Sequence, residues 1–202
     1  MTAILYSYRR CPYAMRARLA LKYAGIDFQL REISLKDKPA SMLQASPKGT
    51  VPVLLLGTQV LEQSLDIMHW ALSQSDPSGW LSVDQALAQA WVEKNDGPFK
   101  KLLDQYKYPN RHPQLNTQNV LDSAVELMLS PMEQALSTQP YLMGEHLSWV
   151  DIAIFPFIRQ FSMVNPDQFK SLSLPKLQHW LSERIDSKLF QSVMEKYPTY
   201  TD

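Results

Sequence analysis

The sequence predicts two domains, a mixed α/β domain with the element order βαβαββα followed by an all-α domain. Short β-prone runs alternate with helical periodicities over residues 1–74, and a polar segment rich in helix breakers occupies residues 75–83. From residue 84 to residue 202 only helical periodicities remain. A chain of 202 residues is long enough for one large domain or two small ones, with a buried core.

The chain begins with a predicted strand, helix and second strand. Ala3–Ser7 is a short β-prone run. A helix that ends at Gly25 is predicted next, from the helical spacing of Ala14, Ala17, Leu21 and Ala24. Asp27–Ile33 alternates apolar and polar residues, as a strand does. Because a helix connects the two strands, we expect them to be parallel.

The rest of the first domain contains a predicted short helix, a hairpin and a longer helix. Ala40–Ala45 is helical in pattern and leads into the breaker cluster Ser46–Gly49. Two short β-prone runs, Val51–Leu56 and Gln59–Leu61, flank Gly57 and predict an antiparallel hairpin. The closing helix is predicted from the spacing of Leu65, Met68 and Leu72.

Four long helical periodicities account for the second domain, over residues 84–107, 117–138, 149–164 and 174–195. Proline- and glycine-containing breaks separate them at 109–113, 140–144 and 166–175. Ser148 and Asp151 precede the apolar run of the third helix with the Ser-x-x-acid spacing of a capping box. We therefore predict a folding role for this pair and not a catalytic one.

Composition excludes several classes of function. The 20 basic and 20 acidic side chains balance, which argues against a general nucleic-acid or anionic-membrane binder. A single cysteine excludes an intrachain disulfide and a multi-cysteine zinc site, and the four histidines are too widely spaced for a metal pattern. The apolar runs are far shorter than the ~20 residues that cross a bilayer. We expect a soluble, cytoplasmic protein without a metal.

The N-terminal arginines do not indicate a targeting peptide. They follow the apolar run of residues 3–6, which is the reverse of the order in a signal peptide. We therefore expect this segment to be part of the folded domain.

Cys11 lies where the first strand meets the first helix. Pro12 suits the first helical turn, which predicts that Cys11 is the N-cap, at the positive end of the helix dipole. Four arginines lie close in the sequence: Arg9, Arg10, Arg16 and Arg18. Both features favour a thiolate with a pKa below the ordinary value of ~8.5. The alternative is a buried, inert cysteine.

Four segments resemble one protein family. Cys11-Pro12-Tyr13-Ala14 resembles the Cys-Pro-Tyr-Cys motif of glutaredoxins with Ala14 in place of the second cysteine. The whole chain resembles the cytosolic glutathione S-transferases, cysteine-type, in which a thioredoxin-like domain precedes a helical one. Further similarities to that family are carried by Ser46–Leu54, Glu62–Ile67 and Ser148–Ala153.

The resemblance implies a glutathione site in the first domain. In the family a cis proline, here Pro52, presents the backbone of the preceding residue, here Val51, to the extended cysteinyl part of glutathione. Ser64, at a helix N-terminus, would hold the γ-glutamyl carboxylate. The full implied set is Tyr13, Lys38, Val51, Pro52, Gln63 and Ser64. Without the resemblance, Ser64 could be a simple helix cap and Lys38 a solvated surface charge.

The implied activity is glutathione-dependent thiol transfer or reduction by Cys11. Glutathione is the expected cosubstrate, and the partner is a small electrophilic or disulfide substrate. Because Ala14 replaces a resolving cysteine, an external thiol must release the enzyme from a mixed disulfide. Members of the family are commonly homodimers, so we expect a homodimer.

Two other functions stay open. In conventional glutathione conjugation, a hydroxyl of Tyr6, Ser7 or Tyr8 would activate the thiol in place of Cys11. Alternatively, the fold would serve as a non-catalytic binding module with a cysteine of ordinary pKa. A second-substrate pocket in the helical domain could be lined by Trp91, Asn95, Asp96, Phe99, Tyr106 and Tyr108, although aromatic residues at helical spacing commonly form core.

Overall fold

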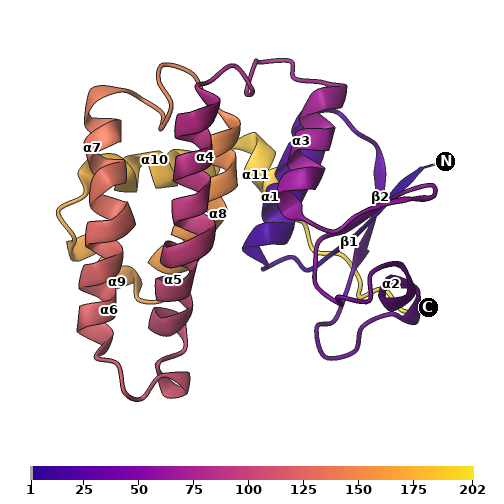
Figure 1. Cartoon of the computed structure of the whole chain (residues 1–202), viewed down its shortest axis with the longest axis horizontal. Coiled ribbons are helices and arrows are strands. Elements are labelled where there is room, and N and C mark those ends of the chain that lie inside the picture. The colour runs from indigo at the N-terminus through magenta and orange to yellow at the C-terminus, as the bar shows by residue number, and fades with distance from the viewer. Residues whose placement is uncertain (1) are drawn as a thin grey trace. The chain divides into compact units, whose positions relative to one another are not determined.

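The computed structural model describes residues 2–202, which form two compact units. The first unit runs to Gly79 and also includes Ser187–Asp202, and the second is Trp80–Asp186 (Figure 1). We had expected the helical domain to extend to residue 202. The structure differs, because the last segment of the chain packs with the α/β unit.

The first unit contains a four-stranded mixed sheet in the order β2-β1-β3-β4. The strands are β1 (Ala3–Ser7), β2 (Phe28–Glu32), β3 (Val53–Leu56) and β4 (Gln59–Leu61). In β1, Leu5 pairs with Leu30 of parallel β2 and with Leu54 of antiparallel β3. The antiparallel hairpin of β3 and β4 completes the sheet. The predicted parallel pair and hairpin are confirmed.

Four helices belong to this unit: α1 (Pro12–Tyr23), α2 (Ala40–Ala45), α3 (Ser64–Gln74) and α11 (Lys188–Val193). Helix α1 packs against both α3 and α11. It ends as predicted at Gly25, whose φ of 68° is left-handed. There the N–H of Ile26 bonds to the carbonyl of Leu21 and that of Gly25 to Lys22, a Schellman ending.

After α11 the chain continues along the free edge of β2. Thr199 forms a parallel bridge with Glu32, and the Tyr200 N–H donates to the Glu32 carbonyl at 2.7 Å. The Asp202 carboxylate accepts a hydrogen bond from the Ser41 N–H at 2.9 Å, at the start of α2. In Figure 1 this yellow segment runs from α11 to α2. The C-terminal segment therefore covers an edge of the sheet that would otherwise be exposed.

The second unit consists of helices, as predicted. Two of the predicted long helices are each interrupted by a π-helical segment of five residues. The first such segment contains Pro98, which lacks the N–H that a regular α-helix requires. The elements are α4 (Gln85–Lys94), η1 (Asn95–Phe99), α5 (Lys100–Lys107), η2 (Pro109–Arg111), α6 (Thr117–Ala124), η3 (Val125–Leu129), α7 (Ser130–Thr138), α8 (Trp149–Ser162), α9 (Pro166–Ser171) and α10 (Pro175–Asp186).

Two helical predictions were wrong in this half of the chain. Helix α9 lies in a segment that we assigned to a break, and its six residues are too few for a recognisable periodicity. It starts at Pro166 after the cap Asn165, whose side chain accepts from the backbone of Gln168. The predicted helix over 174–195 is interrupted at Ser187, which is extended (φ −64°, ψ 139°) and caps α11.

The capping box at the start of α8 is confirmed. The Asp151 carboxylate is fully buried and accepts from the Ser148 N–H at 3.1 Å and the Ser148 hydroxyl at 2.6 Å. It also accepts from the Leu142 N–H at 2.9 Å and the Trp180 indole at 3.0 Å. Asp151 therefore joins three parts of the second unit and has the structural role that the sequence predicted.

Across residues 2–202, no helix combines the length and apolarity needed to cross a membrane.

Candidate active site

Cys11 is the N-cap of α1, as predicted (φ −76°, ψ 123°), and Pro12 opens the helix. Its carbonyl accepts the Met15 N–H at 2.9 Å. The thiol is half-buried and donates to the Val51 carbonyl, with a sulfur–oxygen distance of 3.9 Å. The local sequence thus places the sulfur at the positive end of α1 and beside the loop that contains Val51.

Arg18, two helical turns further along α1, is almost completely buried. Its guanidinium donates to the Ser7 hydroxyl at 2.5 Å, the Arg9 carbonyl at 2.8 Å and the Val193 carbonyl at 3.1 Å. It thereby joins β1, the loop before α1 and α11. These hydrogen bonds offset the free-energy cost of burying the charged guanidinium.

The charge of Arg18 interacts electrostatically with Cys11. Burial lowers the pKa of Arg18 to about 10, and the negative charges of Glu32 and of the Cys11 thiolate oppose that decrease. With a pKa of about 10 the guanidinium remains charged at neutral pH. By reciprocity, the same attraction favours the thiolate form of Cys11.

The Val51–Pro52 peptide bond is cis, as the resemblance implied. Val51 is buried in a cluster with Tyr6 and Val53, and Cys11 packs against that cluster. Upstream, the Ser46 hydroxyl donates to the Glu62 carboxylate, which fixes the preceding loop to the segment before α3.

Lys38 lies against the same loop. Gly49 has a left-handed φ of 63°, and a Cβ added there would lie 3.5 Å from the Lys38 ammonium nitrogen. Lys38 is half-buried, and both its role toward glutathione and the alternative of a solvated surface charge stay predictions.

Ser64 is the first residue of α3, and Gln63 is its exposed N-cap. The Ser64 hydroxyl is buried and accepts from the Arg16 guanidinium at 3.2 Å. The alternative of a simple cap at Ser64 is therefore wrong. Arg16 is completely buried, and its guanidinium carbon lies 5.6 Å from the centre of the Tyr13 ring. A buried cation thus lies beside the N-terminus of α3.

Within the first unit, four of the predicted site residues lie together as two pairs. Cys11 contacts Val51 directly, and Arg16 connects Tyr13 with Ser64. The electrostatic effect of Arg18 on Cys11 was expected from their closeness in the sequence. The burial of Arg16 and Arg18 and the hydrogen bond that Glu62 accepts from Ser46 were not predicted. One signal was available, because α1 is rich in small apolar residues that the fold buries on all sides, so its arginines are buried with them: Ala14, Ala17 and Ala20.

The helical-domain candidates divide into two groups. Phe99 and Tyr106 are core residues, with ring centres 5.5 and 5.0 Å from that of Phe161. The core interpretation is correct for these two. Asn95 is also completely buried. A pocket-lining role for the partly exposed Trp91, Asp96 and Tyr108 stays a prediction.

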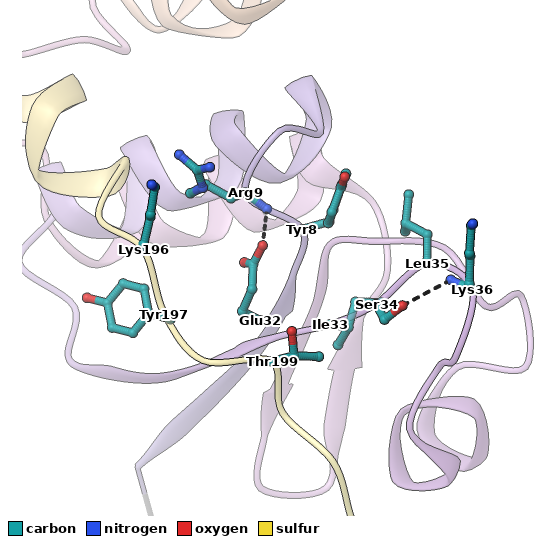
Figure 2. A pocket seen from close by; sticks show the side chains of 10 residues that line it. All are labelled: Tyr8, Arg9, Glu32, Ile33, Ser34, Leu35, Lys36, Lys196, Tyr197 and Thr199. Atoms are coloured by element: carbon teal, nitrogen blue, oxygen red, sulfur yellow. Dashed lines mark hydrogen bonds between the residues drawn. The ribbon is translucent and has the colours of Figure 1, made fainter.

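The first unit has a cavity of about 530 Å³. Figure 2 shows the side chains that line it. They are those of Tyr8, Arg9, Glu32, Ile33, Ser34, Leu35, Lys36, Lys196, Tyr197 and Thr199. The predicted glutathione residues are not among these side chains. Within residues 2–202, no group of three or more His, Cys, Asp or Glu side chains has the arrangement of a metal site.

Comparison with known proteins identifies the family. Residues 5–79 match the N-terminal domain of glutathione S-transferases, and residues 89–183 match the C-terminal domain. Mouse (Mus musculus) glutathione S-transferase omega-1 is 25% identical over 204 residues, which cover 96% of this chain and 85% of the mouse protein. Glutathione S-transferase U22 of Arabidopsis thaliana is 27% identical over 163 residues, covering 78% and 73% of the two chains.

The solved structures agree on the fold. Glutathione transferase Omega 3C from Trametes versicolor superposes with a TM-score of 0.78 at 20% identity, covering 98% of this chain and 91% of that one. Both domains of one family are thus present in the same chain, and the protein belongs to the glutathione S-transferase family as a glutathione transferase.

Proposed function

We propose that this enzyme is a cysteine-type glutathione transferase in which Cys11 catalyses glutathione-dependent thiol transfer. The observation that carries the proposal is the position of the Cys11 sulfur at the N-terminus of α1, 3.9 Å from the Val51 carbonyl. The charge of Arg18 and the dipole of α1 both favour the thiolate, the form that attacks.

Glutathione would bind across the first unit. The backbone of Val51 pairs with the cysteinyl part of the tripeptide as an added strand would. The γ-glutamyl carboxylate lies at the N-terminus of α3, where Ser64 and the buried charge of Arg16 provide a positive environment. Lys38, beside the loop before Val51, is available for the glycyl carboxylate.

The reaction proceeds in two exchanges. The Cys11 thiolate attacks the glutathionyl sulfur of a mixed disulfide, the substrate leaves as a thiolate, and an enzyme–glutathione disulfide forms. A second glutathione thiolate then attacks the bound glutathionyl sulfur. Oxidised glutathione leaves, and Cys11 is again a thiolate. The second thiol is required because Ala14 cannot resolve the intermediate.

A Cys11→Ser variant tests the mechanism. We expect its thiol transfer to fall to the uncatalysed rate, because a serine hydroxyl is not ionised at neutral pH and cannot form the disulfide. Wild-type protein treated with oxidised glutathione is expected to gain one glutathionyl group on Cys11, measured by intact-mass and peptide mass spectrometry. Undiminished thiol transfer by the serine variant would refute the proposal.

The arrangement of the hydroxyl groups supports cysteine over hydroxyl catalysis. Tyr6 is buried, and its hydroxyl is hydrogen-bonded to Ser41 and Arg31. Ser7 is also buried and accepts from the guanidinium of Arg18. Among the three hydroxyl candidates, Tyr8 is the half-buried one. Conjugating activity that survives Cys11→Ala and is lost in Tyr8→Phe would favour the conventional mechanism instead.

The proposal also includes the oligomeric state of the protein and the compartment in which it acts. We expect a cytoplasmic homodimer that acts on a small electrophilic or disulfide substrate. The single cysteine is half-buried and forms no intrachain disulfide, which is consistent with a reducing compartment. Light scattering coupled to size-exclusion chromatography tests the dimer, and a mass near 23.2 kDa would refute it.

A further inference from the structure

The cavity in Figure 2 is bordered by positive charge. It lies where the loop between β1 and α1, the end of β2 and the C-terminal segment meet. Arg9 and Lys196 lie together on one side of Tyr8, and Lys36 lies on the other side (Figure 2). Glu32, the carboxylate among the lining residues, already accepts the Arg9 N–H at 2.6 Å. The lining thus carries three cations and one carboxylate that is already hydrogen-bonded, a net positive charge that favours anions.

Tyr8 connects the cavity with the reactive sulfur. Its side chain lines the cavity and also packs against the core cluster that contacts Cys11. The Cys11 N–H donates to the Tyr8 carbonyl at 2.9 Å. None of the six residues proposed to hold glutathione lines the cavity. A ligand there would contact Tyr8, whose carbonyl is bonded to the backbone of Cys11, without using the side chains proposed to hold the first glutathione.

The proposed function requires such a ligand, because a second thiol must reach the enzyme–glutathione disulfide. We infer that the cavity binds the anionic groups of this attacking thiol, a small thiol that carries carboxylates, such as a second glutathione. Arg9 and Lys196 would hold one carboxylate and Lys36 another.

The chemical step is a balanced exchange. The bound thiol first loses its proton to solvent, and the nearby cations favour that ionisation. Its sulfur attacks the glutathionyl sulfur on Cys11, forming one S–S bond while the bond to Cys11 breaks. The attacking thiol is oxidised, and Cys11 is reduced and leaves as a thiolate.

The test measures only the second exchange, the reduction of the enzyme–glutathione disulfide. It rests on the proposed function, because that disulfide must first form on Cys11. The enzyme–glutathione disulfide is prepared with oxidised glutathione, and its reduction is followed by intact mass. Three thiols are compared at matched thiolate concentration: glutathione, with one net negative charge, uncharged 2-mercaptoethanol and positively charged cysteamine. We expect glutathione to react about tenfold faster than 2-mercaptoethanol and cysteamine to be slowest, because a cationic site enriches anions.

In the double variant Lys36→Gln/Lys196→Gln, the ratio of the glutathione rate to the 2-mercaptoethanol rate is expected to fall severalfold. The glutathione rate should also depend less on salt concentration. Both lysines are exposed, so the fold should tolerate the changes. The matched control is Lys101→Gln with Lys170→Gln, which removes two exposed charges from the second unit and should leave the ratio unchanged.

The outcomes separate the two hypotheses. If the disulfide on Cys11 forms but its reduction is equally fast with all three thiols, or if both double variants behave alike, the inference about the cavity is overturned and the cysteine mechanism stands. If no disulfide forms on Cys11, the cysteine mechanism is wrong, and the cavity inference fails with it.

Discussion

Replacing Arg18 with methionine should destabilise the first unit and make the thiol less acidic. The three shortest hydrogen bonds of the buried guanidinium go to the Ser7 hydroxyl and to the carbonyls of Arg9 and Val193. Methionine fills the space of the aliphatic stem but leaves these acceptors without their donor. At about 1 kcal/mol for each unsatisfied acceptor, the free energy of unfolding should fall by about 3 kcal/mol. The loss of the Arg18 charge should also raise the pKa of Cys11.

Urea unfolding and thiolate absorbance measure the two effects. Arg10→Met is the matched control, because it removes the same charge one residue from Cys11 but from an exposed side chain. Its guanidinium carbon lies 5.8 Å from the centre of the Tyr8 ring, and we expect a change within about 0.5 kcal/mol. If the two variants have the same stability and the same thiol pKa, Arg18 has neither of the roles that we assign to it.

Two further predictions concern a buried carboxylate and a histidine. Asp151→Ala should lower the free energy of unfolding by about 3–5 kcal/mol, because it leaves the buried donors of Leu142, Ser148 and Trp180 unsatisfied. Thermal unfolding followed by circular dichroism measures the effect, and Asp122→Ala, which removes an exposed carboxylate, is the control. Equal melting temperatures would contradict this role. Partial desolvation of the His69 ring, which is exposed on α3, lowers its pKa below 6.5, with a smaller contribution from Arg16 and against the opposing effect of Asp66. The unfolded chain therefore binds this proton at higher pH than the folded protein, so His69 makes stability fall as the pH decreases through 6.5. In urea titrations, His69→Gln should reduce that decrease, and an unchanged pH dependence would show that the shift has no effect on stability.

Local signals predicted the first unit well. Gly25 ends α1, and Cys11 and Pro12 begin it, because capping and proline preferences depend on a few neighbouring residues. The capping box at Ser148 is an equally local pattern. The cis bond before Pro52 was different, since it followed from the family resemblance and not from the bare dipeptide.

Features that depend on distant residues were not predictable in the same way. The sequence placed Arg16 and Arg18 near Cys11 but did not predict that both are buried, with acceptors on Ser64 and Val193 from far along the chain. The cavity in the first unit was also missed, since the two sides of its rim, Lys36 and Lys196, are separated by most of the chain. Hydrophobic periodicity contains no information on such pairings.

The C-terminal segment has a consequence for how the protein is made. A ribosome delivers the sheet strands and α1 early, but Ser187–Asp202 emerges only after the whole of Trp80–Asp186 has been synthesised. The second unit is thus contiguous and can fold as it emerges, whereas the first must wait for its final segment. Until then Arg18 lacks the Val193 carbonyl and β2 has an open edge. The surroundings of the reactive cysteine are therefore completed only after the second unit has been synthesised.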